Sequence, residues 1–512
     1  MGNCRRYARV LKKSRIAEVS RRRSTLRKKK GGRPEFSNQG SEWEMSKSDE
    51  KSKPQDYHKQ GDLFSGTEGV GERKAGRTSR PSYRTELLSR LTEQRALTRG
   101  LVTKIADYGN LLKAYKAVRL NQGSGGVDGE TLESYGVGLD QRIKLLQTAL
   151  TSGGYEPQAV RLVEIPKPNG GVRKLGIPTI GDRVVQQSIL NELQPIYDPY
   201  FSEHSYGFRP GRSAHQAIEA ASRYVQSGKI WVVDIDLASF FDEINHERLM
   251  SRLSKAISDQ ELLALIRKYL KAGVMKDGLV SQRIAGTPQG GPLSPLLSNI
   301  VLDELDRELE VRGLSFARYA DDCNIFVKSK RSAERVMESL IKYIEGVLKL
   351  RVNRDKSGVR RCDEVKFLGH TVEENGKIRI ADGSIVRFKQ KMREVTKRNR
   401  GISFPMLIKE VNLIIQGWAT YYRRCNTWLG ELKVLDGRIR KRLRCYALKQ
   451  HQRRYPTYEY LRSLGVEKGH AWNAVMYRKW WAMANYRPVT TAMGIDWFAR
   501  QGLKSLAAVQ RG

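Results

Sequence analysis

Apolar residues first recur at helical spacing from about residue 83 onward. Between positions 87 and 118 they lie three or four residues apart, as they do along one face of an α-helix; they include Leu87, Leu91, Leu101, Leu111 and Val118. The preceding residues, 1–82, are rich in Ser, Gly, Glu, Lys and Arg and poor in apolar side chains. Such a segment cannot bury enough surface to offset the entropy lost on ordering. The pattern therefore predicts a disordered N-terminal appendage over 1–82, followed by helices.

Two apolar stretches in the middle of the chain have the composition of strands. Residues 231–236 read Trp-Val-Val-Asp-Ile-Asp, and residues 316–327 read as a strand, a tight turn and a second strand. Helical spacing returns over 406–422, where Met406, Val411 and Trp418 belong to one amphipathic pattern. We therefore expect an α+β protein with segments 83–230, 231–380 and 381–512, the last of them helical.

Composition narrows the class of protein. The 512 residues carry a net charge of +38 at pH 7, which favours a polyanionic partner, above all nucleic acid. No apolar run approaches the roughly 18–20 residues of a membrane-spanning helix, so no membrane partner is expected. The five cysteines form no CxxC pair, which argues against a disulfide framework and for a reducing compartment.

The excess charge lies in the two flanks of the chain. Residues 1–80 carry 22 basic and 10 acidic side chains, and residues 381–512 carry 27 basic and 8 acidic ones. The N-terminal clusters fit a solvated tail, a nucleic-acid contact or an organellar presequence. The C-terminal segment also holds six of the eight tryptophans, and cations interleaved with aromatic residues favour a surface for nucleic-acid strands.

Carboxylates follow both predicted strands. Asp234 and Asp236 share one face of the first strand because strand side chains alternate, and Asp321 and Asp322 occupy the turn of the predicted hairpin. Buried carboxylates are costly unless a cation neutralises them. Two strands that each deliver carboxylates could hold two Mg²⁺ ions roughly 4 Å apart for a phosphoryl displacement.

These carboxylates stand within a series of motifs that resembles the group II intron reverse transcriptases. The series comprises Ile165-Pro-Lys-Pro-Asn-Gly-Gly-Val-Arg173, Ser205-Tyr-Gly-Phe-Arg-Pro-Gly-Arg-Ser213, Asp236-Leu-Ala-Ser-Phe-Phe-Asp242, Thr287-Pro-Gln-Gly-Gly-Pro-Leu-Ser-Pro295, Tyr319-Ala-Asp-Asp322, Val352-Asn353 with Lys356, and Phe367-Leu-Gly369. The resemblance implies a right-hand polymerase fold. Residues 83–230 would form an N-terminal extension and fingers, 231–380 a palm whose antiparallel sheet carries the Tyr-Ala-Asp-Asp hairpin, and 381–512 a helical thumb and maturase domain.

The resemblance also assigns roles to individual residues. Asp236, Asp321 and Asp322 are the expected catalytic ligands of two Mg²⁺ ions, with Mn²⁺ as a substitute, and Asp234 is left as a structural neighbour. The expected nucleotide contacts are Lys167 and Arg173 on the triphosphate, Phe241 against a ribose 2′-hydroxyl, and Gln289 beside the templating pair.

The C-terminal segment resembles the maturase domain of the same family. Gly417-Trp-Ala-Thr-Tyr-Tyr422 matches its signature helix, and a basic helix follows, although Cys445-Tyr446 departs from the aromatic sequence expected there. The expected RNA contacts are Arg423, Arg438, Arg440, Lys441, Arg442 and Arg444. Because the chain shows no paired-cysteine HNH endonuclease, the bacterial class C branch is the most similar.

The resulting functional prediction is an RNA-directed DNA polymerase of a mobile group II intron that also acts as a maturase. Its expected partners are intron RNA, an RNA template with a DNA primer, target DNA and dNTPs, in the bacterial cytoplasm in association with the nucleoid. Two alternatives stay open. One is a domesticated bacterial reverse transcriptase used in phage defence or diversity generation, and the other is an RNA-binding maturase that acts in splicing alone.

Overall fold

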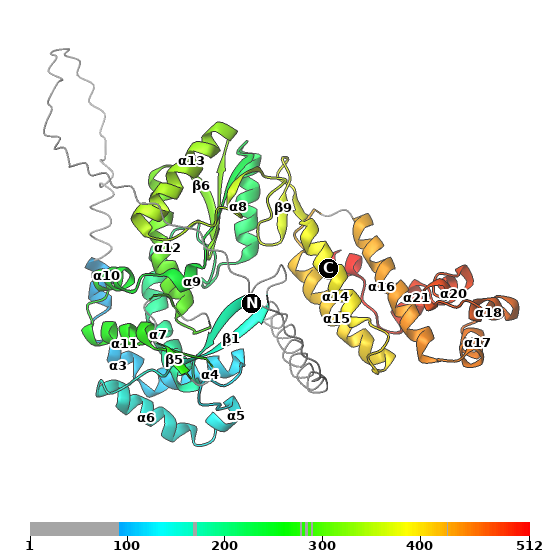
Figure 1. The fold of residues 1–512 in the computed structure, drawn as a ribbon, viewed down its shortest axis with the longest axis horizontal. Helices are drawn as coiled ribbons and strands as arrows, with labels where there is room; N and C mark the ends of the chain where they lie inside the picture. Colours follow the sequence, from blue (N-terminus) through cyan, green and yellow to red (C-terminus); the bar gives the residue numbers. More distant parts are fainter. Residues whose placement is uncertain are drawn as a thin grey trace, which may run out of the picture. The chain divides into compact units, whose positions relative to one another are not determined.

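The computed structural model describes residues 92–166, 172–276, 279–281, 285–287, 290–426 and 429–511, all of which belong to one unit of the chain (Figure 1). The predicted appendage over 1–82 lies outside the described residues, as do Lys167 and Gln289. No helix in the described ranges is long and apolar enough to cross a membrane.

Helices dominate the described residues 92–159, as the apolar spacing predicts. They are α3 (Leu101–Ile105), α4 (Tyr108–Asn121), α5 (Leu132–Tyr135) and α6 (Leu139–Thr151). Asp107 caps the N-terminus of α4, and its carboxylate accepts a hydrogen bond from the backbone N–H of Asn110. Its residues Leu111 and Val118 are buried, which confirms the helical face read from the sequence.

A four-stranded sheet follows, with strand order β2-β1-β4-β5. Its strands are β1 (Val160–Pro166), β2 (Val172–Ile177), β4 (Val274–Lys276) and β5 (Leu279–Ser281). Strands β1 and β2 form an antiparallel hairpin in which Ile165 pairs with Arg173. Helices α7 (Ile180–Tyr197) and α8 (Ala214–Gln226) lie between this hairpin and the next sheet in the sequence, with the short 3₁₀ helix η2 (Asp198–Tyr200) between them.

The second four-stranded sheet, which we call the palm sheet, has the order β6-β7-β3-β8, with every neighbouring pair antiparallel. It consists of β3 (Trp231–Asp236), β6 (Ser315–Tyr319), β7 (Asp322–Val327) and β8 (Gly358–Arg361). The helical elements between its strands are α9 (Phe240–Glu243), α10 (His246–Ala256), α11 (Gln260–Lys271), α12 (Ser294–Val311), α13 (Lys330–Tyr343) and the π-helical turn η3 (Ile344–Leu348).

The two faces of the palm sheet contribute to different hydrophobic cores. Val233, Ile235 and Ile325 point to a core shared with α10, α11 and α12, whereas Val232 and Phe326 join a core shared with α8 and the C-terminal helices. This alternation follows from the period of two in strands, and it places Asp234, Asp236 and Asp322 on the Val232 face.

A two-stranded sheet of β9 (His370–Val372) and β10 (Ile378–Ile380) follows, and the residues that the structure describes after it, 381–426 and 429–511, are mainly helical. The helices are α14 (Asp382–Val395), α15 (Phe404–Tyr421), α16 (Leu429–Gln450), α17 (Arg454–Ser463), α18 (Lys468–Val475), α19 (Trp480–Met483), α20 (Arg487–Ala492), α21 (Ile495–Arg500) and α22 (Leu506–Arg511). Val411 and Trp418 of α15 are buried, as the amphipathic pattern predicts. Met406 is 52% exposed, so it does not belong to the buried face of this helix.

Candidate active site

Two of the predicted carboxylates belong to residues that are paired on neighbouring strands of the palm sheet and lie on the same face. Asp236 is the last residue of β3 and pairs in register with Asp322, the first residue of β7, while Asp234 pairs with Asn324. The prediction that Asp234 and Asp236 share one face is therefore consistent with the strand geometry. The backbone of Asp236 is fixed by Ser357, whose Oγ accepts its N–H at 2.9 Å, and by Asn353, whose N–H donates to its carbonyl oxygen at 2.9 Å.

Asp321 lies in the two-residue turn that joins β6 to β7. Tyr319 pairs with Asp322 across the hairpin, which leaves Ala320 and Asp321 as the turn. Ala320 has a φ of 61°, in the left-handed region that costs a residue with a Cβ about 1–2 kcal/mol. Gly207 packs against this turn so closely that an added Cβ would lie 2.3 Å from the Ala320 nitrogen. Neighbouring contacts thus hold the turn in a strained conformation.

Arg318 fixes the same turn from the opposite face of the palm sheet. Its side chain is fully buried, and its Nη1 donates to the Ala320 carbonyl oxygen at 2.9 Å and to Asn299 Oδ1 at 3.1 Å. Its Nη2 donates to Ser205 Oγ at 2.7 Å, and Asp306 accepts from both Nε and Nη2 at 2.7 and 2.5 Å. All five N–H donors of the guanidinium are therefore used, which a buried arginine requires.

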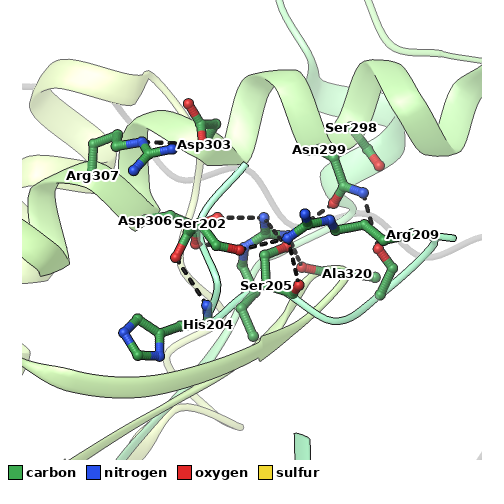
Figure 2. A network of polar contacts seen from close by, with 12 residues as sticks. Ser202, His204, Ser205, Arg209, Ser298, Asn299, Asp303, Asp306, Arg307 and Ala320 are labelled. Carbon is green, nitrogen blue, oxygen red and sulfur yellow. Dashed lines mark hydrogen bonds and ion pairs between the residues drawn. The ribbon is translucent and has the colours of Figure 1, made fainter. Parts of the chain in front are cut away.

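This polar network reaches well beyond the hairpin (Figure 2). Asn299 and Asp306 both belong to α12, and Asn299 Nδ2 also donates to the carbonyl oxygen of Gly207 at 2.9 Å. Arg209 donates to the carbonyl oxygens of Ser202 and Ser205 at 2.6 and 3.0 Å. The segment 202–209, helix α12 and the carboxylate-bearing turn are thereby joined into one rigid support.

The carboxylates at this end of the palm sheet repel one another. Burial, followed by the charges of Asp234, Asp321 and Asp236, raises the pKa of Asp322 to about 7. Burial also raises the pKa of Asp321, and the charge of Asp236 adds to that effect, while Arg173 opposes it. A concentration of buried negative charge of this kind is typical of a site that receives a cation.

Three cations of the chain stand near these carboxylates, and we assigned no role to any of them from the sequence. Lys356 Nζ lies 3.2 Å from Asp236 Oδ2, and Arg360 Nη1 lies 2.8 Å from Asp234 Oδ2. The positive charge of Lys366 lowers the pKa of Asp322, but this effect is smaller than those of burial and of the neighbouring carboxylates, which raise it. Asp234 therefore has Arg360 as its ion-pair partner, and Asp236 has Lys356. The only sequence signal was the position of Lys356 in a recognised motif.

The donor set fits a hard divalent cation by its chemistry, since carboxylate oxygens are the ligands that such ions prefer. Within the described ranges, no three His, Cys, Asp or Glu side chains already stand together as a metal site. The raised pKa values of Asp321 and Asp322 nevertheless show negative charge that the chain's own cations leave uncompensated. Asp236, Asp321 and Asp322 are the residues that could share such an ion.

Two of the four residues expected to contact the nucleotide, Arg173 and Phe241, lie among the described residues. Arg173 is exposed on β2, and its charge is felt at Asp321. Phe241 is half-buried in α9, with its ring centroid 5.3 Å from that of Phe240. The Phe241 carbonyl oxygen accepts a hydrogen bond from the N–H of Thr287 at 2.7 Å. Thr287, two residues before Gln289 in the sequence, is therefore held beside α9.

The six expected RNA contacts do not share one environment. Arg423 and Arg438 are exposed, and Arg440, Lys441 and Arg442 are all partly exposed. Arg444 is only 9% exposed and donates to the carbonyl oxygens of Ala484 and Met493 at 3.1 and 3.2 Å. These two residues end α19 and α20, so Arg444 neutralises two helix C-termini inside the domain. Its placement does not suit the RNA contact expected from the sequence.

Comparison with known families divides the chain in the same way as its motifs. Residues 165–372 match the family described as reverse transcriptase (RNA-dependent DNA polymerase). Residues 385–465 match the family described as group II intron, maturase-specific domain. The expected α+β class, with a polymerase region followed by a helical region, is confirmed.

Individual proteins are also similar to this chain. The chain is 37% identical to protein YkfC of Escherichia coli (strain K12) over 284 residues, which cover 48% of this chain and 74% of that protein. It is 30% identical to the group II intron-encoded protein LtrA of Lactococcus lactis subsp. cremoris over 350 residues, which cover 53% of this chain but only 58% of LtrA. A solved structure, the partial Cas6-RT-Cas1–Cas2 complex, is similar with a TM-score of 0.32 and 25% identity, covering 49% of this chain and 43% of that chain.

Proposed function

Because this chain belongs to the family of group II intron-encoded reverse transcriptases and maturases, we propose that it copies intron RNA into DNA and assists splicing of the same RNA. Proteins of this family are RNA-directed DNA polymerases that depend on divalent metal ions, and they bind nucleic acid.

The observation that carries the polymerase proposal is the pairing of Asp236 with Asp322 beside the strained turn that holds Asp321. These three carboxylates hold two Mg²⁺ ions in our proposal, with Mn²⁺ as a substitute. When bound there, the ions would lower the pKa of the primer 3′-hydroxyl and stabilise the charge on the leaving pyrophosphate. Asp234 is reserved for Arg360 and stays outside the metal site.

The chain's own cations and apolar groups would orient the nucleotide. Arg173, together with Lys167, grips the triphosphate from the β1–β2 hairpin in this proposal. Phe241 closes the space around the sugar against a 2′-hydroxyl, and Gln289 lies beside the templating pair. The hydrogen bond from the Thr287 N–H to the Phe241 carbonyl oxygen supports a position of Gln289 close to Phe241.

The maturase proposal rests on the second family match and on the basic helices after residue 381. The partners would be intron RNA, template and primer, target DNA and dNTPs, and the place of action would be the bacterial cytoplasm at the nucleoid. A domesticated reverse transcriptase is not favoured, because the maturase-specific domain is present. A maturase that acts in splicing alone is not favoured either, because all three carboxylates stand at the palm-sheet end.

Primer extension on poly(rA)/oligo(dT) tests the polymerase proposal directly. Asp236→Ala, Asp321→Ala and Asp322→Ala should each lower the rate by about 10³-fold or more, since each removes a metal ligand needed in the transition state. Asp363→Ala is the matched control, because Asp363 is exposed and takes part in no ion pair within the described ranges. Substantial extension by Asp321→Ala would refute the assignment of the metal ligands.

A further inference from the structure

A hollow of about 260 Å³ lies in the helical region, between α14 and α16 and beside α19. We call it the α14–α16 hollow. Its floor is apolar and consists of the buried residues Phe388, Met392, Leu435 and Ile439. Its volume is below the range of about 300–1,000 Å³ that is typical of pockets for drug-sized ligands, so it suits a smaller group.

The lining of the hollow is cationic and contains no acidic side chain. Lys389 and Arg393 come from α14, and Arg438 and Arg442 come from α16. None of these four residues forms an ion pair with any acidic side chain that the structure describes. Four cations around one hollow repel each other, and an anion bound there would relieve that repulsion.

Arg442 is held in place although no carboxylate compensates its charge. Its Nε donates to Thr396 Oγ1 at 2.5 Å and its Nη2 donates to the carbonyl oxygen of Arg393 at 3.0 Å. Burial, and then the charges of Arg393, Arg398 and Arg438, lower its pKa. A fixed guanidinium loses little entropy when it binds a phosphate, so it is prepared for an anion.

Trp481 adds an aromatic wall to the hollow. Its side chain is 43% exposed, which is unusual for an indole that could have been buried in the adjoining core. Lys441 Nζ lies 4.3 Å from the centre of the indole ring, so this cation covers part of the ring and adds another positive charge beside the hollow.

The apolar floor and the exposed indole suit a flat ring, and the uncompensated cations suit at least one phosphate on the same ligand. We propose that the α14–α16 hollow binds one unpaired nucleotide of an RNA strand, with its base between Trp481 and the apolar floor and its flanking phosphates at Arg393, Arg438 and Arg442. A base in a duplex is already stacked on both sides, so it cannot insert between Trp481 and the apolar floor. This inference rests on the proposed function, which supplies the RNA, and it adds a specific subsite for an extruded base.

The test uses the full-length chain and two RNA hairpins that differ only in a single bulged 2-aminopurine nucleotide. The wild type should bind the bulged hairpin about tenfold more tightly than the paired one, because stacking on an aromatic side chain contributes that much per base. The fluorescence of 2-aminopurine should fall on binding. Trp481→Leu, and Met392→Trp, which fills the hollow, should each abolish both the preference and the fluorescence change.

Trp472→Leu is the matched control, since Trp472 is 49% exposed in the same helical region but does not line the hollow. It should keep the preference for the bulge. Equal binding of the two hairpins by the wild type, or an unchanged preference in both hollow variants, would overturn the proposal and leave the cations as contacts for duplex phosphates. Primer extension by the same preparations separates the two hypotheses, because an inactive wild type would count against the proposed function itself.

Discussion

The guanidinium of Arg318 donates to the carbonyl oxygen of Ala320, two residues along the same hairpin, from the side of the palm sheet that the carboxylates do not occupy. Asp306 neutralises the charge of Arg318, and both side chains are fully buried. Arg318 therefore cannot touch a nucleotide. It is a positioning residue that holds the strained turn on which Asp321 lies.

The first prediction separates this positioning role from stability. Arg318→Met alone should cost about 3–5 kcal/mol of unfolding free energy, because it leaves the Asp306 carboxylate buried without a partner. The double variant Arg318→Met/Asp306→Leu should regain most of that stability, since apolar side chains can replace a buried ion pair. Primer extension by the double variant should stay at least about tenfold below the wild type, because nothing then holds the Ala320 carbonyl.

Urea unfolding and steady-state kinetics at several Mg²⁺ concentrations check this prediction. The exposed pair of Arg312 and Glu308 is the control, and its removal should cost less than about 1 kcal/mol and leave catalysis unchanged. A double variant at the palm that polymerises at the wild-type rate would show that the bond to Ala320 does not set the turn.

The second prediction concerns the stability of the metal-free protein. The pKa of Asp322 is about 7 in the folded state, above its value of 3.8 without the fold, so the folded state binds more protons between these values. The stability contribution of this group is present at low pH and is lost as the pH rises toward 7. Asp322→Asn should therefore be more stable than the wild type at about pH 8 and nearly equal to it at about pH 4.

Urea unfolding in a metal chelator measures this difference, with Asp363→Asn as the control for the same substitution at an exposed position. Added Mg²⁺ should reverse the order at about pH 8, because the ion stabilises only the chain that retains its ligands. An Asp322→Asn variant that is less stable than the metal-free wild type at high pH would contradict the repulsion inferred here.

The third prediction links protons and metal in catalysis. Asp322 must lose its proton to bind a cation, so the proton and the ion compete for one carboxylate. At limiting Mg²⁺ the rate of primer extension should fall as the pH drops below about 7, the pKa of Asp322. At saturating Mg²⁺ the same fall should move to lower pH. Single-turnover extension at two Mg²⁺ concentrations across this range checks it, and an acid limb that ignores Mg²⁺ would exclude the carboxylates as its source.

The fourth prediction separates polymerisation from assistance to splicing. The proposed role in splicing is assistance, so the protein contributes binding and folding of the RNA there rather than phosphoryl transfer by its carboxylates. Asp321→Ala/Asp322→Ala should lose primer extension and still promote splicing at near-physiological Mg²⁺. Both activities would be measured on one preparation, and normal RNA binding without splicing would refute the division of labour.

The sequence was sufficient for the features that depend on local periodicity. Asp234 and Asp236 share a face because strands alternate, and the turn at Asp321 follows from two apolar runs that flank a polar pair. Arg318 gave no such signal, because Asp306 and Ser205 lie 12 and 113 residues away and only the tertiary fold brings them to it. Arg360 and Lys356 are likewise far along the sequence from Asp234 and Asp236, and only the tertiary fold brings each pair together.

The basic helix shows the limit of counting charges. Five cations within seven positions of α16 were expected to include several that face RNA, yet Arg444 points inward and donates to the carbonyl oxygens at two helix ends. Free carbonyl groups at the ends of α19 and α20 attract a cation as a phosphate would. Composition cannot distinguish these two kinds of acceptor.

The last prediction makes that distinction by the salt dependence of RNA binding. Each phosphate neutralised by a cation contributes about −0.7 to −0.9 to the slope of log affinity against log salt. Arg423→Gln/Arg440→Gln, which removes an exposed and a partly exposed cation, should therefore flatten the slope for a group II intron transcript by nearly two and leave thermal stability unchanged. Arg444→Gln should do the reverse: it leaves the carbonyl oxygens of Ala484 and Met493 without their donor, so the melting temperature should fall while the slope stays parallel to that of the wild type. Affinity across a range of salt concentrations and a thermal melt, measured on both variants, give four values. A flattened slope in Arg444→Gln at unchanged stability would show that this side chain leaves the helix ends and binds RNA.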